Sequence, residues 1–598
     1  MLVRRVATAA QVAAVSLLGL VAPEVARAQV LRLGPQFQIN TYTTNVQSRP
    51  VVKNGSDGTF LVVWQSNGSA GTDTDGLSIQ GQRYDKNGAP LGSQFQVNTY
   101  TTGGQDAAAV SSDSFSGDFV AVWTSEGSAG SDTDGTSIQG QRYDSAGSPV
   151  GSQFQINTYT TGAQSAPAVA ASFPGFVVVW QSEGGDGTDT DASSIQAQIF
   201  DQTGAASGSQ FQVNTNTTNV QQTPVVALDQ QGYFVVAWAC NGSPSDPFGF
   251  SIQAQKFSPG GTPNSLQFQV NADSFGNQVS PRLGGGLLAW VSDYDASLTD
   301  TDGTSIMAGG LETQGTGGSG GVVVNTYTTG NQLNPAVSAD GTLVVWESTQ
   351  GSGSDASGTS IQGRHLYSYS PTNVEFQVNT FTTSNQGMPA AGTDGRGNYL
   401  VVWDSLDGDG TDGVGSIQGQ RYARERRILG KKMILRDRTG AEADRRAVIL
   451  AKEVPTDVYG TFYTFDGDPT VDGATLRVIA NGGTPSEEAY ELDAAGWTAI
   501  SNGYRYRGPT GVDGDPVKLV VIKVGYAAYL KVLLNGSLGT QPLGAVPPNP
   551  GTDGGMILTI HGGGTYCATY GGAAGGTELD DTTTQWRVLN PTLQPACP

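Results

Sequence analysis

The chain has 598 residues, of which 53 are acidic and 31 are basic, so its formal net charge is −22. A surface this acidic repels nucleic acid and anionic membranes, which excludes nucleic acid as a partner and favours cations or basic surfaces. Only 14% of the residues are charged and 84 are glycines, a composition typical of short β-strands joined by tight turns.

Residues 1–28 have the pattern of a cleaved signal peptide. Arg4 and Arg5 precede an apolar stretch, and Ala26-Arg27-Ala28 matches the A-x-A cleavage pattern. That stretch is short for a membrane span, and no later segment is long and apolar enough to cross a bilayer. We therefore expect a protein that is secreted or held at the cell surface, with no transmembrane segment after signal removal.

A repeated unit of roughly 57 residues fills positions 36–422, and such a period is typical of propellers, solenoids and arrays. Each unit contains an F-Q-[VI]-N stretch and an S-I-Q-[GA]-Q segment, with variation. Its clearest marker is a tryptophan that closes an apolar run, found at Trp64, Trp123, Trp180, Trp238, Trp290, Trp346 and Trp403.

Four strands are predicted in each unit, and we name them a, b, c and d in chain order. Strand b is apolar on both faces, as at 177–180, so both faces must be covered, and radially packed sheets achieve this. A d-type strand at 37–40 precedes the first unit, whereas the last unit ends after its c strand at 416–422. This offset lets the N-terminal strand close a ring. The sequence therefore predicts an all-β fold with a seven-bladed β-propeller, in preference to an open solenoid.

The composition changes after the repeats. Basic residues cluster between 424 and 452, which predicts a basic linker at 423–432, and strand-like runs between turns predict a smaller all-β, sandwich-like domain at 433–598. Of the three cysteines, Cys567 and Cys597 are the candidates for a disulfide in an oxidising compartment. Cys240 follows a core tryptophan and is interpreted as a small apolar filler.

The loops between strands b and c are rich in aspartate. Carboxylates at alternate positions followed by glycine suit Ca²⁺, but the same D-x-D-G pattern is also good turn chemistry, and both interpretations stay open. The candidate metal ligands are Asp73, Asp75, Asp132, Asp134, Asp189, Asp191, Asp300, Asp302, Asp407, Asp409 and Asp412.

The d–a connections carry N-T-Y-T-T segments and emerge on the same face of a propeller as the b–c loops. Their tyrosine rings can stack on a sugar while amide and carboxylate groups bind its hydroxyls. The candidate ligand-binding residues are Tyr42, Tyr100, Tyr159 and Tyr327.

Enzyme motifs are weak in this sequence. H-G-G-G at 561–564 and G-x-S-x-G at 317–321 stand in the wrong order for an acyl-transfer site, and no histidine or cysteine spacing suggests zinc. The predicted inner strands are apolar or small except for Asp106, so we expect the channel to lack the carboxylate pair that propeller glycosidases need. We therefore predict that the protein is not an enzyme.

The segments F-Q-V-N-T at 95–99, V-V-V-W at 177–180 and I-Q-G-Q-R-Y-D at 138–144 resemble tandem repeats of large secreted bacterial surface proteins, some of which also carry calcium-binding repeats. The stretch with D-P-T-V at 468–471 and Tyr566-Cys567 resembles a C-terminal module of secreted bacterial proteins. The resemblance implies an extracellular adhesion or recognition role and no reaction.

The leading hypothesis is a secreted, monomeric, non-enzymatic propeller that binds a glycan or a surface protein on its aspartate- and tyrosine-bearing rim, with Ca²⁺ stabilising the loops if it binds. Two alternatives stay open: a hydrolase or lyase acting on polysaccharide, and a purely structural surface module.

Overall fold

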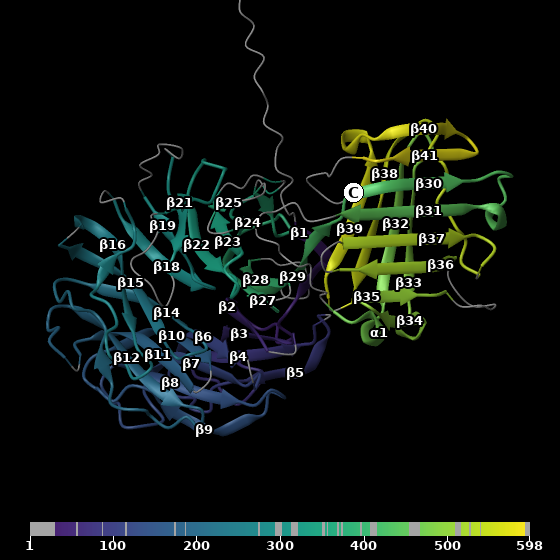
Figure 1. Ribbon diagram of the computed structural model, residues 1–598. Helices are drawn as coiled ribbons and strands as arrows, with labels where there is room; N and C mark the ends of the chain where they lie inside the picture. The colour runs from purple at the N-terminus through teal and green to yellow at the C-terminus, as the bar shows by residue number, and fades with distance from the viewer. Residues whose placement is uncertain are drawn as a thin grey trace, which may run out of the picture.

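The computed structural model describes residues 30–591 except 56–57, 87, 114–115, 173–174, 186, 245, 273–275, 294–301, 312–320, 350–352, 354, 356, 368–369, 372–374, 395–396, 407–414, 454–466, 509–515, 525–527, 539 and 562 (Figure 1). Within these residues the fold is all-β, and helix is confined to α1 (Pro469–Asp472) and three 3₁₀ turns, Glu442–Asp444, Ala494–Gly496 and Gly572–Ala574. None of the described helices could span a membrane.

The repeated units form successive antiparallel sheets, which we number in chain order. Sheet 1 contains β2 (Gln47–Asn54), β3 (Phe60–Asn67), β4 (Leu77–Tyr84) and β5 (Pro90–Gln96), and sheet 2 contains β6 (Gln105–Ser112), β7 (Phe119–Glu126), β8 (Thr136–Tyr143) and β9 (Pro149–Gln155). Sheet 3 contains β10 (Gln164–Ser172), β11 (Gly175–Glu183), β12 (Ser193–Asp201) and β13 (Phe211–Gln212), and sheet 4 contains β14 (Gln221–Leu228), β15 (Phe234–Ser243), β16 (Asp246–Phe257) and β17 (Phe268–Gln269).

Sheets 5 to 7 follow the same order. Sheet 5 contains β18 (Gln278–Gly284), β19 (Leu287–Ser292), β20 (Ser305–Gly310) and β21 (Val322–Val323). Sheet 6 contains β22 (Gln332–Val337), β23 (Leu343–Ser348), β24 (Ser360–Tyr367), β25 (Ser370–Pro371) and β26 (Phe376–Gln377). Sheet 7 contains β27 (Gln386–Thr393), β28 (Asn398–Ser405) and β29 (Ser416–Arg427), and β1 (Val30–Gln38) pairs antiparallel with β29 as its outer strand.

The sheets form a closed, propeller-like ring (Figure 1). The first strand of each sheet contacts the first strand of the next, and β27 of sheet 7 contacts β2 of sheet 1. Between consecutive sheets lies a buried apolar cluster that includes the repeated tryptophan, whose side chain is at most 1% exposed in every unit. Covering both faces of each sheet in this way is what the all-apolar b strands require.

One buried asparagine per unit fixes the connection between neighbouring sheets. Asn98 accepts a hydrogen bond from Ile79 N at 2.9 Å and donates one to Tyr100 O, also at 2.9 Å. Asn40 makes the same pair of bonds at the ring closure, with Ile417 N at 2.8 Å and Tyr42 O at 2.9 Å. The N-terminal strand is thus held by the same bonds as the internal outer strands.

The C-terminal part consists of two sheets that share one apolar core. The larger sheet has β34 (Trp497–Ile500), β35 (Gly503–Tyr506), β36 (Val517–Lys523), β37 (Ala528–Asn535), β31 (Arg446–Glu453), β30 (Gly430–Arg436), β41 (Gln585–Leu589) and β40 (Thr577–Thr582), in that spatial order. The smaller sheet has β39 (Thr565–Gly571), β38 (Gly551–Ile560), β32 (Ala474–Gly482) and β33 (Ser486–Leu492). Burial alternates along β37, so one face of the larger sheet covers the core and the other faces outward.

The two parts are joined by strand pairing. The segment expected as a linker, 423–432, is mostly strand, because β29 continues to Arg427 and pairs in parallel with β39. Lys86 of sheet 1 also forms an ion pair with Asp472 of α1 at 2.6 Å.

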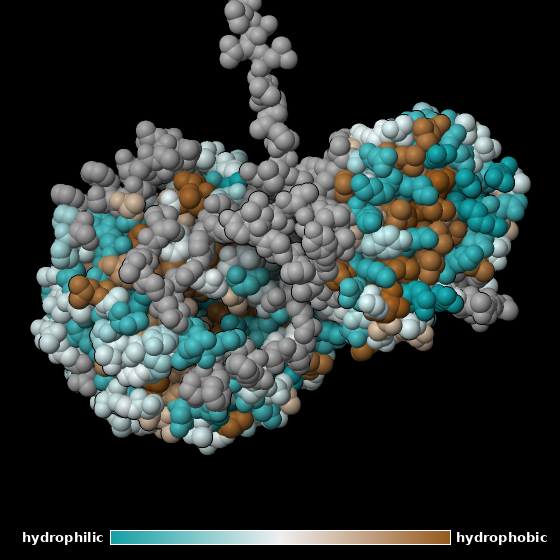
Figure 2. Space-filling view, viewed as in Figure 1, coloured by the Kyte–Doolittle hydropathy of each residue, from teal (hydrophilic) through white to brown (hydrophobic). Residues whose placement is uncertain are grey.

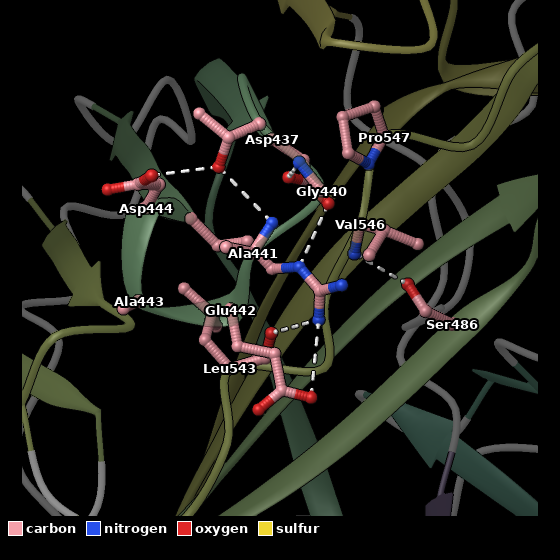
Figure 3. Close-up of polar contacts among 12 residues, drawn as sticks. Asp437, Gly440, Ala441, Glu442, Ala443, Asp444, Ser486, Leu543, Val546 and Pro547 are labelled. Carbon is pink, nitrogen blue, oxygen red and sulfur yellow. Dashed lines mark hydrogen bonds and ion pairs between the residues drawn. The ribbon is translucent and has the colours of Figure 1, made fainter.

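Within the C-terminal part, Arg445 of the β30–β31 turn donates to Asp437 at 2.9 Å and to Leu543 O at 3.0 Å (Figure 3).

Asn40→Ala should lower the stability of the ring by about as much as the matched change Asn98→Ala. Each substitution leaves a buried isoleucine N–H without its acceptor, which costs about 1–3 kcal/mol. Thermal melts of the two variants and the wild type measure the effect. An unchanged melting temperature for Asn40→Ala, beside a reduced one for Asn98→Ala, would show that the N-terminal strand does not close the ring.

Candidate active site at the mouth of the central channel

The first aspartate of the described b–c loops is a buried structural residue. Asp73 accepts a hydrogen bond from Asn98 Nδ2 at 2.6 Å and one from Asp75 N at 3.2 Å. Asp132 and Asp189 repeat both contacts in sheets 2 and 3 with the same distances. These carboxylates tie the loop to the buried asparagine of the outer strand.

The second aspartate holds the next d–a loop. Asp75 accepts from Gly103 N at 3.0 Å, Asp134 from Gly162 N at 3.1 Å and Asp191 from Asn219 N at 3.0 Å. Protein N–H groups therefore occupy both members of each pair, which favours the turn interpretation of the D-x-D pattern.

The remaining candidate metal ligands add no cluster. Asp302 is described, whereas Asp300, Asp407, Asp409 and Asp412 lie outside the described residues. Over the part of the chain that the structure describes, no group of three His, Cys, Asp or Glu side chains could hold a metal ion.

The candidate tyrosines lie on separate sheet junctions and do not meet at one point. Tyr42, Tyr100, Tyr159 and Tyr327 are all half-buried. The Tyr100 hydroxyl packs against Gly127, where a Cβ atom would stand 2.6 Å away, and its backbone N–H donates to Gln153 at 3.0 Å. Each ring is thus partly exposed on its own loop.

The two described cysteines have different environments. Cys240 is a free, buried thiol, which agrees with its interpretation as a small core residue. Cys567 is buried in β39 and is disulfide-bonded. Cys597 lies outside the described residues, and its role as the partner stays a prediction.

The ring encloses a cavity of about 500 Å³, whose mouth lies on the same side as the d–a loops because the inner strands begin there. Figure 2 shows the ring hollowed near its centre. Each inner strand carries a β-bulge at this level, and its first residue has a positive φ of 46–55°. These residues are Arg49, Ala107, Ala166, Thr223, Ser280, Asn334 and Met388, and all but Ser280 line the cavity.

Such a conformation is unfavourable for residues with a Cβ atom and costs roughly 1–3 kcal/mol at each position. Strained backbone of this kind and β-bulges both concentrate next to functional sites. In every described sheet but sheet 5 the bulge residue lines the cavity, so the channel wall at this level depends on which residue stands there.

A carboxylate pair lies next to the channel wall at this level, although neither member is among the residues that line the cavity. Glu347 of sheet 6 and Asp404 of sheet 7 flank Gly387, where a Cβ atom would be 3.1 Å from Glu347 Oε2 and 3.0 Å from Asp404 Oδ1. Both side chains are half-buried and contact residues that line the cavity. The pair does not stand on the innermost strands, where channel carboxylates are expected from the sequence, because both residues follow the tryptophan at the end of strand b.

Backbone and amide donors hold the two carboxylates. Glu347 Oε2 accepts from Asn334 Nδ2 at 2.9 Å and from Met388 N at 3.4 Å. Asp404 Oδ2 accepts from Arg49 N at 3.2 Å across the junction of sheets 7 and 1. In each case the side chain after the tryptophan binds the N–H of the next sheet's bulge residue.

Sheet 1 shows that this structural role needs no charge. The equivalent residue there is Gln65, and its neutral amide oxygen accepts from Ala107 N of sheet 2 at 3.5 Å. Carboxylates in sheets 6 and 7 therefore place charge where the fold requires only an acceptor.

Burial, with a smaller contribution from the Glu347 carboxylate, raises the pKa of Asp404 to about 6, although the Arg49 N–H and guanidinium lower it. Burial likewise raises the pKa of Asp106, with Arg49 again lowering it. Arg49 thus lies between two acids from its two neighbouring sheets. A carboxyl that stays protonated at mildly acidic pH next to a second carboxylate is the arrangement expected of an acid–base pair.

No protein-family model matches the chain, and no curated protein sequence matches it. Solved structures are similar at low scores. A protein of unknown function from Dyadobacter fermentans has a TM-score of 0.39 and 11% identity, covering 67% of this chain and 100% of that one. An alpha-L-arabinanase from Penicillium chrysogenum has a TM-score of 0.37 and 10% identity, covering 65% and 98%. A leech intramolecular trans-sialidase has a TM-score of 0.35 and 11% identity, covering 65% and 70%.

Most of these similar proteins are enzymes, and this finding contradicts the prediction that the chain is not an enzyme. Beside the channel, Glu347 and Asp404 form a carboxylate pair that contacts lining residues without lining the cavity itself. At TM-scores below 0.5 the similarities carry no argument about substrate, so the chemistry must be argued from the site.

Chelation should leave the ring's stability unchanged. The paired aspartates already accept hydrogen bonds from protein N–H groups, so their turns need no cation. Thermal melts in EDTA and in millimolar Ca²⁺ should coincide. A higher melting temperature in Ca²⁺ that is abolished by Asp132→Asn would instead assign a bound ion to these loops.

The stability of the protein should depend on pH through Asp404. Its raised pKa means that the folded protein holds this proton more tightly than the unfolded chain. The free energy of unfolding should therefore fall as pH rises from about 4 to about 6, by on the order of 2 kcal/mol relative to Asp404→Asn. Urea denaturation across this range measures the slope. Glu183→Gln, which changes an exposed rim acid, should keep the wild-type slope, and an Asp404→Asn slope equal to that of the wild type would contradict the assignment.

Proposed function

We propose that this chain is a secreted glycoside hydrolase whose residues 36–422 form a seven-bladed β-propeller and whose residues 433–598 form a sandwich-like domain. The observation that carries the proposal is the Glu347–Asp404 pair at the mouth of the channel. Loops bearing Tyr42, Tyr100, Tyr159 and Tyr327 surround the same face and offer aromatic edges along which a sugar chain can lie.

The environments of the two carboxyl groups support different roles. Asp404, with a pKa of about 6, retains its proton at mildly acidic pH and is suited to be the general acid. Glu347 accepts hydrogen bonds from Asn334 and Met388, which hold its carboxylate beside Asp404 and suit it to be the nucleophile. An acid and an ionised carboxylate on either side of one point are what cleavage of a glycosidic bond requires.

The spacing of the pair favours retention of configuration. Since both oxygens lie close to the same point above Gly387, they are no more than about 6 Å apart, near the roughly 5 Å of retaining enzymes and short of the inverting range. Asp404 would protonate the glycosidic oxygen as the bond from the anomeric carbon breaks, while Glu347 attacks that carbon. Water would then displace Glu347 and return a proton to Asp404, so that each cycle consumes one water and releases two sugar fragments.

Glu347→Gln and Asp404→Asn should each reduce hydrolysis by at least about 100-fold, the usual contribution of a positioned acid or base. Both changes keep an oxygen acceptor for the neighbouring bulge, as Gln65 does in sheet 1, so folding should persist. The assay is reducing-end release from a panel of polysaccharides and aryl glycosides, with NMR of the first product anomer. Glu183→Gln is the matched control and should retain wild-type activity.

Three results would contradict the proposal. Wild-type rates in both variants would remove the pair from the reaction. An unsaturated, ultraviolet-absorbing product would assign a lyase. Absence of turnover on every substrate, together with glycan binding that is independent of both residues, would favour recognition without catalysis.

A further inference from the structure

Among the described residues, the channel of this acidic protein carries cations that form no ion pair with a carboxylate. The first residue after the bulge is valine or alanine in six of the described sheets, namely Val51, Ala109, Ala168, Val225, Ala336 and Ala390. In sheet 5 the equivalent residue is Arg282. A long cationic side chain thus occupies a position where the rest of the ring has small apolar groups.

Arg282 faces the lumen. Its side chain lines the same 500 Å³ cavity as Asn334 and Met388, and it is solvent-exposed although the ring surrounds it. Its Nη1 donates to the adjacent Pro281 O at 2.8 Å, and it forms no ion pair with any carboxylate among the described residues. Desolvation by the surrounding ring lowers the pKa of Arg282.

Lys53 adds a second cation further along the inner strands, away from the d–a loops. It lines a second cavity of about 710 Å³ that continues along the inner strands below the first, together with Gly284 and Gly392. Burial lowers the pKa of Lys53 as well, and Asp229 is the carboxylate that lines the same cavity. Enclosing a charge without a partner is unfavourable, and an anionic ligand would supply the missing partner.

The arrangement is directional. Arg282 belongs to sheet 5, Glu347 to sheet 6 and Asp404 to sheet 7. Arg282 therefore lies to one side of the acid pair. On the other side the Arg49 backbone N–H donates to Asp404, and the positive charge of Arg49 lowers the pKa of both Asp404 and Asp106. A net charge of −22 repels anions from the outer surface, so an acidic sugar would gain its attraction only inside the channel.

We propose that the substrate of this proposed hydrolase is an anionic glycan. Arg282 binds the carboxylate or sulfate of a sugar unit beside the bond to be cut, an assignment that rests on the proposed function. The planar guanidinium matches either group with paired hydrogen bonds. Lys53 attracts the same charge towards the interior of the channel. The cavity volume of about 500 Å³ is in the usual range for small-ligand sites.

The test is binding to the full-length Glu347→Gln protein, which separates recognition from turnover. Isothermal titration calorimetry should show a short oligogalacturonate, or a sulfated carboxyl-free oligosaccharide, binding at least tenfold more tightly than the carboxyl-reduced neutral oligogalactose. The preferred probe tells whether the recognised group is carboxylate or sulfate. Adding Arg282→Val should abolish the preference, and Arg282→Lys should restore part of it.

Two controls keep the outcome clear. Valine already stands at this position in sheets 1 and 4, so Arg282→Val should fold, which its melting temperature checks. Lys518→Gln removes one positive charge from an exposed site on β36 and should keep the preference. Equal affinity for anionic and neutral probes, or an anion preference that survives Arg282→Val, would overturn the inference. Anion binding through Arg282 without hydrolysis by the wild type would overturn the hydrolase and leave the anion site standing.

Discussion

A carboxamide in a protein interior must find partners for its oxygen and for its N–H groups, because an unsatisfied buried polar group costs more than the bond it forgoes. The asparagine that ends each outer strand meets this requirement with backbone groups of a c strand and of the following loop, as Asn98 does with Ile79 and Tyr100. The first aspartate of the b–c loop then binds the same side chain. One asparagine thereby fixes the outer strand, the c strand and two loops. The loops of the rim therefore have the same conformation in successive sheets.

That rigidity supports the strained inner wall. Each bulge places a residue with a Cβ atom in the left-handed region. In sheets 2, 7 and 1 the bulge N–H donates to the side chain that follows the tryptophan of the preceding sheet. The tryptophan packs between two sheets and so positions the residue that follows it. A neutral glutamine is sufficient in sheet 1, and replacing it with an acid elsewhere changes the electrostatics of the channel with little change in the backbone.

The repeats, the strand runs and the completion of the last sheet by β1 could be read from the sequence, since they depend on local pattern and on the order of similar segments. The role of the aspartate pairs could not, because Asp73 meets Asn98 and Asp75 meets Gly103 only after the sheets pack. Glu347 and Asp404 were visible as the residues after Trp346 and Trp403. Their place at the channel depends on the bulges and on the junctions between sheets, which no periodicity in the sequence encodes. Arg282 was hidden for the same reason, as one substitution in an inner strand.

Ring closure explains why the departures from the repeat form one site. Arg282, Glu347 and Asp404 belong to sheets 5, 6 and 7, and Arg49 belongs to sheet 1, more than 350 residues from Asp404 in the chain. Because β1 completes sheet 7 and β27 contacts β2, these sheets are consecutive around the channel. Sheets 2 and 3 carry only alanine at the corresponding lining positions, Ala107, Ala109, Ala166 and Ala168. One side of the lumen is therefore charged and the opposite side is small and apolar, which is the asymmetry needed to hold a sugar ring by one edge while an acid and a carboxylate reach its anomeric carbon.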